Sequence, residues 1–289
     1  MMKIRPECFP CLLRRSLYET NLVNPELGYD AMKAAADALL LEFGENANSA
    51  EVATKVHRVV YDLLGTDDPY KEVKKKSNEV AQRLYPRAEE LVRGSDDPFR
   101  AAVTCSIAGN VLDFGIRTRI SGPEGLEPIF EKIYTDGLGH DDTPRIKEIL
   151  AEADEVLIFG DNAGEIVFDR LLVRELKKFG GNVTYVVRGR PILTDATLED
   201  ALEFGMDELA DEVLTTNAFA VGVDFNRLDD ALRRKLDQAG LTICKGMANW
   251  ESFSDQDYRP IAYLVHAKCR PVAESMGVPL DRSSAKLFE

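Results

Sequence analysis

The turn at Asp161 and Asn162 carries the side chains of this sequence that are best suited to chemistry. An apolar run at 156–159 precedes it and is typical of a strand buried on both faces of a parallel sheet. Helical periodicity begins just after it, at Glu165, and extends to Phe179. The turn is therefore expected at the carboxyl end of a strand, where open α/β sheets bind ligands. A carboxylate beside a carboxamide supplies oxygen ligands for a hard cation such as Mg²⁺.

The start of the following helix suits a phosphate group. The first N–H groups of a helix lack partners within the helix, and the helix dipole places partial positive charge beside them. We expect the N–H groups of Ala163 and Gly164 to hold phosphate oxygens next to the cation. The turn is thus interpreted as a combined metal and phosphate site.

Polar side chains also follow two other predicted strands. Asp195 ends the segment that comes after the apolar run 183–187, and Lys245 comes directly after the run 241–244. Because parallel strands end at one edge of a sheet, we expect both residues to face the same crevice as Asp161. Asp195 then completes an oxygen shell for the metal, and Lys245 neutralises a phosphate on the opposite side.

Each of these residues also has a structural interpretation. Asp161 and Asp195 are natural helix N-caps, and Asn162 readily adopts a left-handed turn. Lys245 and the arginines at 188–190 belong to residue types that usually lie solvated on the surface. Only their joint position at one predicted sheet edge favours a site over these alternatives.

The rest of the pattern predicts an α/β fold in two unequal parts. From Arg5 to about Leu150 the sequence has helical periodicity and no convincing strand, and from Thr143 strands alternate with helices. We expect a helical N-terminal subdomain at 1–142 that roofs the crevice. Residues 143–289 are expected to form a three-layer α/β/α domain around a mainly parallel, Rossmann-like sheet.

Individual elements follow from the same periodicities. The expected strands are 156–159, 183–187, 212–214, 241–244 and 261–265. The expected helices are 11–18, 29–43, 49–64, 71–92, 100–114, 144–153, 165–179, 198–204, 228–238 and 270–276. Pro86 is expected to kink or break its helix, and Ser49 to cap the helix that it begins. The segment 120–139 is expected to be broken loop with a short helix.

The composition excludes several classes of protein. The chain has 289 residues, with 36 Lys and Arg against 50 Asp and Glu, and a net charge of −14. This charge argues against a general nucleic-acid binder, and no apolar run approaches the roughly 20 residues that span a bilayer. The N-terminal residues lack the apolar core of a secretory signal. We therefore expect a cytoplasmic protein that handles a small anion and binds neither nucleic acid nor membrane.

The pair Cys8 and Cys11 has half the spacing pattern of a zinc or redox site. Five cysteines cannot all pair within one chain, so thiols or ligands are expected rather than a disulfide framework. No second Cys-x-x-Cys exists in the sequence, although Cys269 could approach the pair in space. Cys105 and Cys244 are expected in the core.

Four segments together resemble the damage-control phosphatase family, formerly a domain of unknown function, which includes acidic-residue-methyltransferase-like members. They are Phe-Gly-Asp-Asn-Ala-Gly-Glu at 159–165, Lys-Gly-Met-Ala-Asn-Trp-Glu at 245–251, Asp-Pro-Tyr at 68–70 and Ser-Ile-Ala-Gly-Asn at 106–110. The resemblance covers nearly the whole chain in order, and is strongest for the compact, microbial branch that carries Cys-x-x-Cys. One departure is Met247-Ala248, where a Gln-Gly-like pair is commoner in the family.

The resemblance implies a metal-dependent phosphatase of small, often damaged metabolites, such as sugar phosphates and phosphopantetheine or nucleotide derivatives. The family's metal ligands match Asp161, Asn162 and Asp195, and its phosphate-binding lysine matches Lys245. Its members use Mg²⁺, Mn²⁺, Co²⁺ or Ni²⁺.

The same resemblance implies that Ser106 and Asn110 line the substrate pocket, and that Asn249 contacts the substrate from the segment 245–251. Without the resemblance, the small residues around Gly109 would be interpreted as close packing between helices.

The hypothesis is phosphomonoester hydrolysis, with Asp161, Asn162 and Lys245 as the catalytic residues. Whether Asp161 attacks phosphorus or orients a water stays open. The alternatives are an adenosylmethionine-dependent carboxyl methyltransferase, a non-catalytic phosphometabolite-binding protein, and a zinc-stabilised adaptor that uses the cysteine pair. The segment 160–164 lacks the glycine spacing of a dinucleotide-binding turn, and is an equally poor adenosylmethionine turn.

Overall fold

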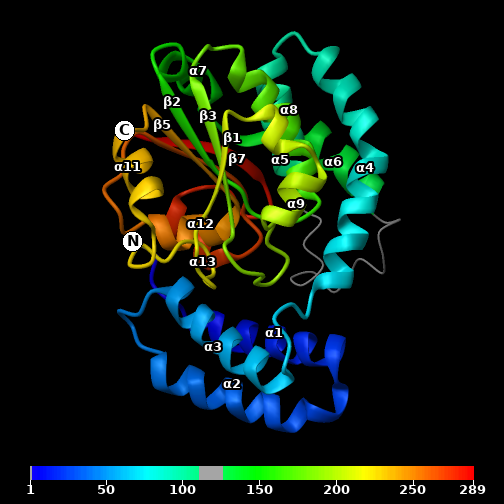
Figure 1. The fold of residues 1–289 in the computed structure, drawn as a ribbon, viewed down its shortest axis with the longest axis vertical. Coiled ribbons are helices and arrows are strands. Elements are labelled where there is room, and N and C mark those ends of the chain that lie inside the picture. The colour runs from blue at the N-terminus through cyan, green and yellow to red at the C-terminus, as the bar shows by residue number, and fades with distance from the viewer. Residues whose placement is uncertain (1, 111–125) are drawn as a thin grey trace.

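A mainly parallel β-sheet occupies the centre of the molecule (Figure 1). The computed structural model describes residues 2–110 and 126–289. Within them the sheet has seven strands in the order β1-β7-β6-β5-β2-β3-β4, all parallel to their neighbours except β6 and β7. The strands are β1 (Leu138–Asp141), β2 (Glu155–Phe159), β3 (Asn182–Val187), β4 (Glu212–Thr215), β5 (Leu241–Lys245), β6 (Ile261–His266) and β7 (Ser283–Phe288).

Helices cover both faces of the sheet and form a separate bundle at one end (Figure 1). The helices are α1 (Cys8–Val23), the 3-10 helix η1 (Pro25–Leu27), α2 (Gly28–Glu42), α3 (Ser49–Leu64), α4 (Lys71–Arg93), α5 (Pro98–Gly109), α6 (Leu126–Asp136), α7 (Thr143–Leu150), α8 (Glu165–Lys177), α9 (Leu198–Glu203), α10 (Met206–Leu209), α11 (Asp230–Gln238), α12 (Gly246–Phe253) and α13 (Arg270–Met276). Across the described part of the chain, none of them is long and apolar enough to cross a membrane. The α/β class expected from the sequence is confirmed.

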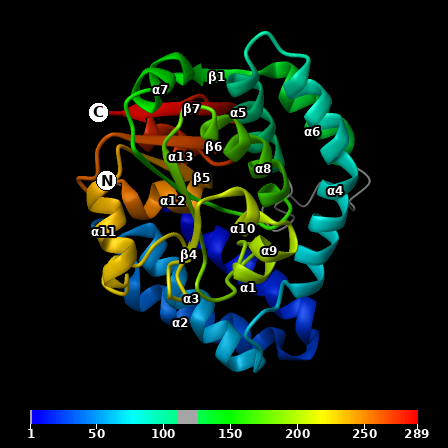
Figure 2. The same cartoon turned by 45° about the horizontal axis from the view of Figure 1, so that its top comes forward.

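Alternate residues of the central strands enter two different cores, as the pleat requires. In β2, Val156 and Ile158 join the core formed with α4, α5 and α8, while Leu157 and Phe159 join the core formed with α11, α12 and α13. Figure 2 shows these two groups of helices on opposite sides of the sheet. Because both faces are covered, the central strands read as continuous apolar runs, which explains why they are visible in the sequence.

The bundle of α1, α2 and α3 packs against loops of the α/β part. Leu12, Leu39 and Val56, one from each helix, share a core with Leu193 and Phe219. Leu193 lies on the loop after β3, and Phe219 lies on the loop after β4. The bundle therefore covers loops at the carboxyl ends of two strands.

The sequence pattern does not predict two of the edge strands. β1 lies within the stretch that is expected to contain no strand, so that expectation is wrong, and β7 is absent from the expected strands. β1 has only four residues, Gly139 among them, and none of them is fully buried. It pairs in parallel with β7, which pairs antiparallel with β6. Backbone pairing rather than side-chain pattern specifies these strands. The expected boundary between the two parts of the chain, at residue 142, would separate β1 from its sheet.

One local expectation is wrong in part and another is wrong. α4 continues through Pro86, so the break, one of the two expected outcomes, is absent, and the other, a kink, stays a prediction. The N-cap of α3 is Asn48 rather than Ser49, since the Asn48 Oδ1 accepts hydrogen bonds from the N–H groups of Ala50 at 2.9 Å and Glu51 at 3.2 Å. Ser49 is already the first helical residue.

Parts of two further expectations lie outside the described residues. The helix expected at 100–114 ends at Gly109 within α5, and the positions 111–114 are not described. The same holds for 120–125 in the expected broken loop, whereas the following residues form α6.

Candidate active site

The carboxyl ends of β2, β3 and β5 lie side by side at one edge of the sheet. β2 pairs in parallel with β3 on one side and with β5 on the other. Asp161 closely follows β2, Asp195 lies on the loop after β3, and Lys245 is the last residue of β5. The structure therefore brings together the three segments in which the sequence predicts a site.

Arg188 joins the two aspartates of the predicted metal site. Its Nε donates to the Asp195 Oδ2 at 2.6 Å, and its Nη2 lies 3.8 Å from the Asp161 Oδ1. The Arg188 side chain is only 1% exposed, so the interpretation of this arginine as a solvated loop charge is wrong. A guanidinium buried between carboxylates offsets their repulsion and fixes their orientation.

Asn162 connects the turn after β2 to the loop after β3. Its Nδ2 donates to the Asp161 Oδ2 at 2.7 Å, and its Oδ1 accepts from the Thr194 hydroxyl at 2.7 Å. The backbones are joined as well, because the N–H of Ala196 donates to the carbonyl of Asp161 at 2.7 Å. Asn162 and Asp195 also form an isolated antiparallel bridge. The candidate ligands are thus held in place by the main chain.

The structural roles considered for these residues are not the ones observed. Gly164 occupies the N-cap position of α8, and Thr197 caps α9 in a capping box with Asp200. Neither Asp161 nor Asp195 is a helix cap. Asn162 does not adopt a left-handed turn, because the described non-glycine residues with positive φ are Leu193, Asn217 and Asp281.

The two N–H groups expected to hold phosphate already have protein partners. The N–H of Ala163 donates to the carbonyl of Thr194 at 2.8 Å. The N–H of Gly164 donates to the Oδ1 of Asn78, a residue of α4, at 2.6 Å. A phosphate oxygen at this helix start would have to replace these partners.

Lys245 lies below the sheet edge, against α8. Its Nζ donates to Glu165 and, at 2.7 Å, to the Asp169 Oδ1, and its side chain is fully buried. The hydroxyl of Tyr185 donates to the Asp169 Oδ2 at 2.5 Å from the neighbouring strand β3. The ammonium group is therefore paired with two carboxylates of the protein, and its expected contact with phosphate stays a prediction.

Ser106 and Asn110 belong to the same buried network. Ser106 Oγ donates to the Asp169 Oδ1 at 2.6 Å. Asn110 Nδ2 donates to the Asp161 Oδ2 and to the Glu165 Oε2, both at 2.7 Å. Both side chains are at most 1% exposed. The end of α5 thus packs closely on α8, as the structural alternative holds, while Asn110 also contacts the predicted metal ligand.

Asn249 holds the frame of the site together. Its Nδ2 donates to the carbonyls of Gly160 at 3.1 Å and Lys245 at 2.7 Å, and its Oδ1 accepts from Arg188 at 3.1 Å. These contacts link the ends of β2, β5 and β3. The Asn249 amide is thus engaged by the protein itself, and its expected contact with substrate stays a prediction.

Sequence reasoning interprets Arg188 only as a solvated charge, and it assigns no role to four other residues of the network: Glu165, Asp169, Tyr185 and Lys268. Lys268 Nζ donates to the carbonyl of Asn110 at 2.5 Å, and its charge opposes the rise in the pKa of Asp161. Arg188 and Lys268 follow β3 and β6, so the rule that ligands bind at strand ends also points to them. Asp169 and Tyr185 lie within regular elements and carry no such signal.

Burial changes the protonation of two carboxyl groups. Burial, together with nearby Asp195, raises the pKa of Asp161 to about 7, against the effect of Arg188. Burial likewise raises the pKa of Glu165 to about 7, against the effect of Lys245. Burial acts to lower the pKa of Lys245, but Asp169 and Glu165 outweigh it and leave this pKa above its ordinary value. The lysine stays charged, and the carboxylates repel one another.

The donors at the sheet edge suit a hard divalent cation. Asp161, Asn162 and Asp195 offer carboxylate and amide oxygens, and Asp195 lies close enough to raise the pKa of Asp161. Within the described residues, no group of three or more His, Cys, Asp or Glu side chains could hold a metal ion. A site here thus depends on the Asn162 amide and on ligands from outside the protein. Mg²⁺ fits this description, since it binds through one or two carboxylates with waters and phosphate.

Cys8 and Cys11 are not part of a comparable set of metal donors among the described residues. All five cysteines are free thiols, and Cys105 and Cys244 are buried in the core as expected. Burial raises the pKa of Cys8 to about 11 and that of Cys269 to about 12, so both thiols stay protonated at neutral pH. Cys269 lies near enough for Cys8 and Cys11 to raise its pKa, so it approaches the pair as the sequence allows. In the described residues, however, no group of three or more His, Cys, Asp or Glu side chains is arranged to hold a metal ion, and the zinc-stabilised adaptor gains no support.

Gly246 permits the close approach of β5 to Asp161. It has a φ of +72°, and a Cβ at this position would lie 1.8 Å from the Asp161 Oδ2. Gly246→Ala is therefore expected to displace the Asp161 carboxylate and to lower the thermal unfolding midpoint. Gly180→Ala is the matched control, because Gly180 also has a positive φ, +95°, but meets nothing within 4 Å. If both variants lose the same stability, the contact between a side chain at position 246 and Asp161 does not contribute to the loss.

The raised pKa of Asp161 predicts a pH-dependent stability in the presence of EDTA. The folded pKa of about 7 exceeds the unfolded value of about 4, so the folded state binds more protons between these values. Stability is then fully present below about pH 4 and falls as the pH rises through 7. Asp161→Asn removes this loss and is expected to be more stable than the wild type at pH 8, by at most about 4 kcal/mol.

Chemical denaturation at pH 5 and pH 8 measures this difference. Asp136→Asn serves as the control. The Lys132 hydrogen bond lowers the pKa of Asp136, so the ionised form of this carboxylate stabilises the folded state instead of destabilising it. The prediction is wrong if the advantage of Asp161→Asn is the same at both pH values.

Comparison with known proteins identifies the family of this chain. Residues 4–283 match the model of the damage-control phosphatase ARMT1-like domain. A damage-control phosphatase of Archaeoglobus fulgidus is 44% identical over 292 residues, which cover 100% of both chains. The damage-control phosphatase PH1575 of Pyrococcus horikoshii is 32% identical over 281 residues, which cover 96% of both chains.

The fold agrees as well. The crystal structure of a DUF89 family protein, PH1575 of Pyrococcus horikoshii, superposes with a TM-score of 0.89 at 30% identity and covers 100% of both chains. The resemblance noted in the sequence is thereby confirmed, and the chain belongs to the damage-control phosphatase ARMT1-like family.

Proposed function

We propose that this protein is a divalent-metal-dependent phosphatase that hydrolyses phosphomonoesters of small metabolites. The observation that carries the proposal is the pair of buried carboxylates, Asp161 and Asp195, held by Arg188 at the end of adjacent strands. Such a pair suits a cation that also takes phosphate oxygens. The 44% identity to a protein named a damage-control phosphatase supports the same activity.

Asp161, Asn162 and Asp195 would hold the metal ion, which supplies charge neutralisation and polarisation of the phosphoryl group when bound. Mg²⁺ or Mn²⁺ is the expected ion, with Co²⁺ or Ni²⁺ as further possibilities. Asn110 orients Asp161 through its amide, and Arg188 orients Asp195 through its guanidinium. The protein thus fixes both carboxylates before substrate arrives, which reduces reorganisation during the reaction.

Lys268 supplies positive charge for the substrate phosphate. It is half-buried, lies at the carboxyl end of β6, and acts on Asp161 through its charge. Lys245 acts one layer below as a positioning residue, because its partner Glu165 accepts from Asn110 and thereby sets the side chain that faces Asp161. This assignment replaces direct phosphate binding by Lys245 with an indirect role.

The substrate class is a small phosphorylated metabolite, such as a sugar phosphate or a phosphopantetheine or nucleotide derivative. The α1–α3 bundle packs on the loop that carries Leu193, two residues before Asp195, through the hydrogen bond from its N–H to the Tyr61 hydroxyl at 3.0 Å. The bundle therefore supports one side of the site. Its side chains would then determine which leaving group the site accepts.

Asp161→Ala is expected to abolish phosphate release from a panel of phosphomonoesters, by at least about a hundredfold, because it removes a charged group of the catalytic site. The panel is measured with Mg²⁺, Mn²⁺, Co²⁺ and Ni²⁺ against EDTA. Asp207→Ala, which removes an exposed carboxylate on α10, is the control for charge. Full metal-dependent activity of Asp161→Ala would reject the site. Turnover by neither protein, with calorimetric binding of adenosylmethionine, would instead favour the methyltransferase alternative.

Lys268→Gln is expected to lower kcat/KM by at least about tenfold, since a charge-assisted hydrogen bond contributes roughly 1.5–3 kcal/mol. Lys268→Arg should retain most of the activity because it keeps the charge. Lys178→Gln, on the exposed end of α8, is the matched control. An unchanged kcat/KM for Lys268→Gln would remove this lysine from the phosphate site and leave the metal site unaffected.

A further inference from the structure

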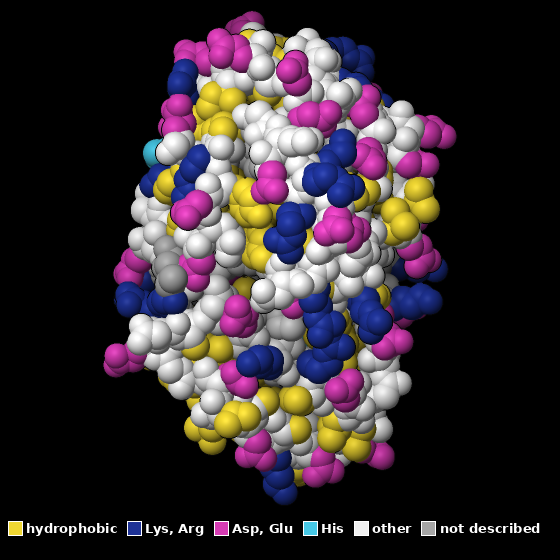
Figure 3. All heavy atoms as spheres, turned by 60° about the vertical axis from the view of Figure 1, so that its left-hand side comes forward, with side chains coloured by type: hydrophobic (Ala, Val, Ile, Leu, Met, Phe, Trp, Pro, Cys, Tyr) yellow, Lys and Arg dark blue, Asp and Glu magenta, His cyan; other side chains and the backbone are white. Residues whose placement is uncertain are grey.

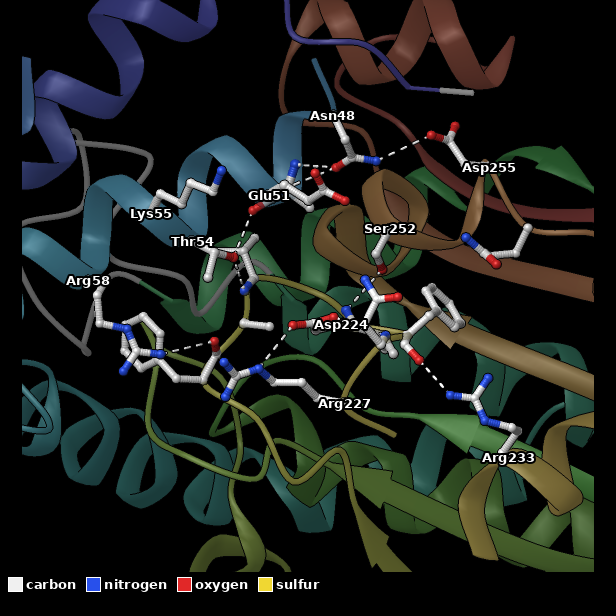
Figure 4. A pocket seen from close by; sticks show the side chains of 18 of the residues that line it. Asn48, Glu51, Thr54, Lys55, Arg58, Asp224, Arg227, Arg233, Ser252 and Asp255 are labelled. Atoms are coloured by element: carbon white, nitrogen blue, oxygen red, sulfur yellow. Dashed lines mark hydrogen bonds and ion pairs between the residues drawn. The ribbon is translucent and has the colours of Figure 1, made fainter. Parts of the chain in front are cut away.

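A second cavity lies between the helical bundle and the α/β part, away from the candidate active site. Its volume is about 810 Å³, within the range of small-molecule sites, and it is lined by α3, the loop 219–227, α11 and the end of α12 (Figure 4). None of the metal, phosphate or substrate residues assigned above lines it. The cavity is therefore a separate place on the molecule.

One side of this cavity carries arginines. Arg58 lies with its guanidinium carbon 3.9 Å from the centre of the Phe219 ring and donates to the Phe219 carbonyl at 3.5 Å. Arg233 donates to the Phe225 carbonyl at 2.7 Å. Carbonyl partners do not neutralise charge, and in the described part of the chain neither guanidinium forms an ion pair with a carboxylate. Each still has N–H donors to offer, since a guanidinium carries five.

A third cation and its carboxylate lie nearby. Arg227 Nε is 3.6 Å from the Asp224 Oδ2, and the arginine side chain is 71% exposed. An exposed pair of this kind is weak, so the arginine can turn toward a ligand at small cost. Figure 4 shows the three arginines spread along one side of the cavity, Arg58 at the left and Arg233 at the right, with Arg227 and Asp224 between them.

The opposite side is rich in acceptors. Glu51 and Asp255 lie there with Asn48, whose Nδ2 donates to the Asp255 Oδ2 at 3.4 Å (Figure 4). Glu51 precedes Arg58 by two turns of α3, which separates these two residues by about 10 Å along the helix. The cavity thus offers arginines along one side and acceptors for hydroxyl or amino groups along the opposite side.

The loop that forms the wall is rigidly held. The N–H of Val221 donates to the Thr54 Oγ1 at 2.9 Å, and the N–H of Val223 donates to the Ser252 Oγ at 3.1 Å. Gly222 between them has a φ of +69°, and a Cβ there would lie 2.4 Å from the Ala248 carbonyl oxygen. A wall held in this way is pre-organised, so a ligand loses little free energy to ordering it.

The cavity lining carries four Lys or Arg side chains and three carboxylates, the reverse of the balance in the whole chain. With a net charge of −14, the protein repels anions in general. On the face that Figure 3 shows, Lys and Arg side chains nevertheless gather at mid-height. An anion would bind beside Arg58 and Arg233, whose guanidinium groups form no ion pair in the described part of the chain.

We propose that this cavity binds a phosphorylated small molecule of up to nucleotide size. Its phosphate groups contact Arg58, Arg227 and Arg233, and its hydroxyl or amino groups donate to Glu51 and Asp255. This site is independent of the phosphatase proposal, because none of its residues belongs to the proposed metal or phosphate site.

Calorimetry with ADP and with inorganic pyrophosphate, both in EDTA, tests the proposal on the full chain. ADP offers both ends of the expected ligand, whereas pyrophosphate offers only the anionic end, so ADP is expected to bind more tightly. Arg58→Gln and Arg233→Gln are each expected to weaken ADP binding by at least about tenfold, or roughly 1.4 kcal/mol. Arg234→Gln, an exposed neighbour on α11 that does not line the cavity, should bind ADP like the wild type.

Two controls make the result decisive. Asp195→Asn alters the candidate active site and should leave ADP binding unchanged. Because Arg58 and Arg233 lie on different elements, misfolding of one variant leaves the other as a valid test. No binding of either probe by the wild type at millimolar concentrations would overturn the proposal. So would binding that is lost in Asp195→Asn and kept in both arginine variants, since the anion would then lie at the sheet edge.

Discussion

The burial of several carboxylates at one sheet edge is the constraint on which the rest of this structure depends. A buried carboxylate is costly unless cations and hydrogen-bond donors surround it. Here two buried cations, Arg188 and Lys245, serve this purpose, and amides and hydroxyls from α5, β3 and the turn after β2 donate the remaining hydrogen bonds. The carboxylates are those of Asp161, Glu165, Asp169 and Asp195. Removal of any donor would leave part of this charge without compensation.

This constraint explains features that are far apart in the sequence. Gly246 must lack a side chain because the Asp161 carboxylate occupies the space beside it. The end of α5 must lie against α8 because Asn110 reaches both Asp161 and Glu165. The loop after β3 must hold Leu193 in a left-handed conformation, with φ 51°, where its N–H meets Tyr61 of the helical bundle. The site therefore couples the two parts of the chain.

The sequence predicts the central strands and the shared edge, because runs buried on both faces are continuous and parallel strands end together. It does not predict β1, whose pairing depends on backbone contact with β7. The face of the sheet on which the Lys245 side chain lies can be predicted in part from the sequence. Leu241 and Ile243 of the same strand face the core of α8, so the period of two places Lys245 on that face as well. Its partners Glu165 and Asp169 come from another element, which periodicity within one strand cannot identify.

The balance of charge in the network also bears on the proposed metal. Four buried carboxylates and two buried cations, Arg188 and Lys245, give a formal charge of −2 when all are ionised. Burial, and to a smaller extent the neighbouring carboxylates, raises the pKa values of Asp161 and Glu165, so that their ionised forms are costly in the folded state. A divalent cation between Asp161 and Asp195 would bring the network to neutrality, and Lys268 would then add positive charge for the phosphate. The negative charge that destabilises the network at high pH would thus favour the binding of a divalent metal. Through the metal, it would also favour the binding of a phosphorylated substrate.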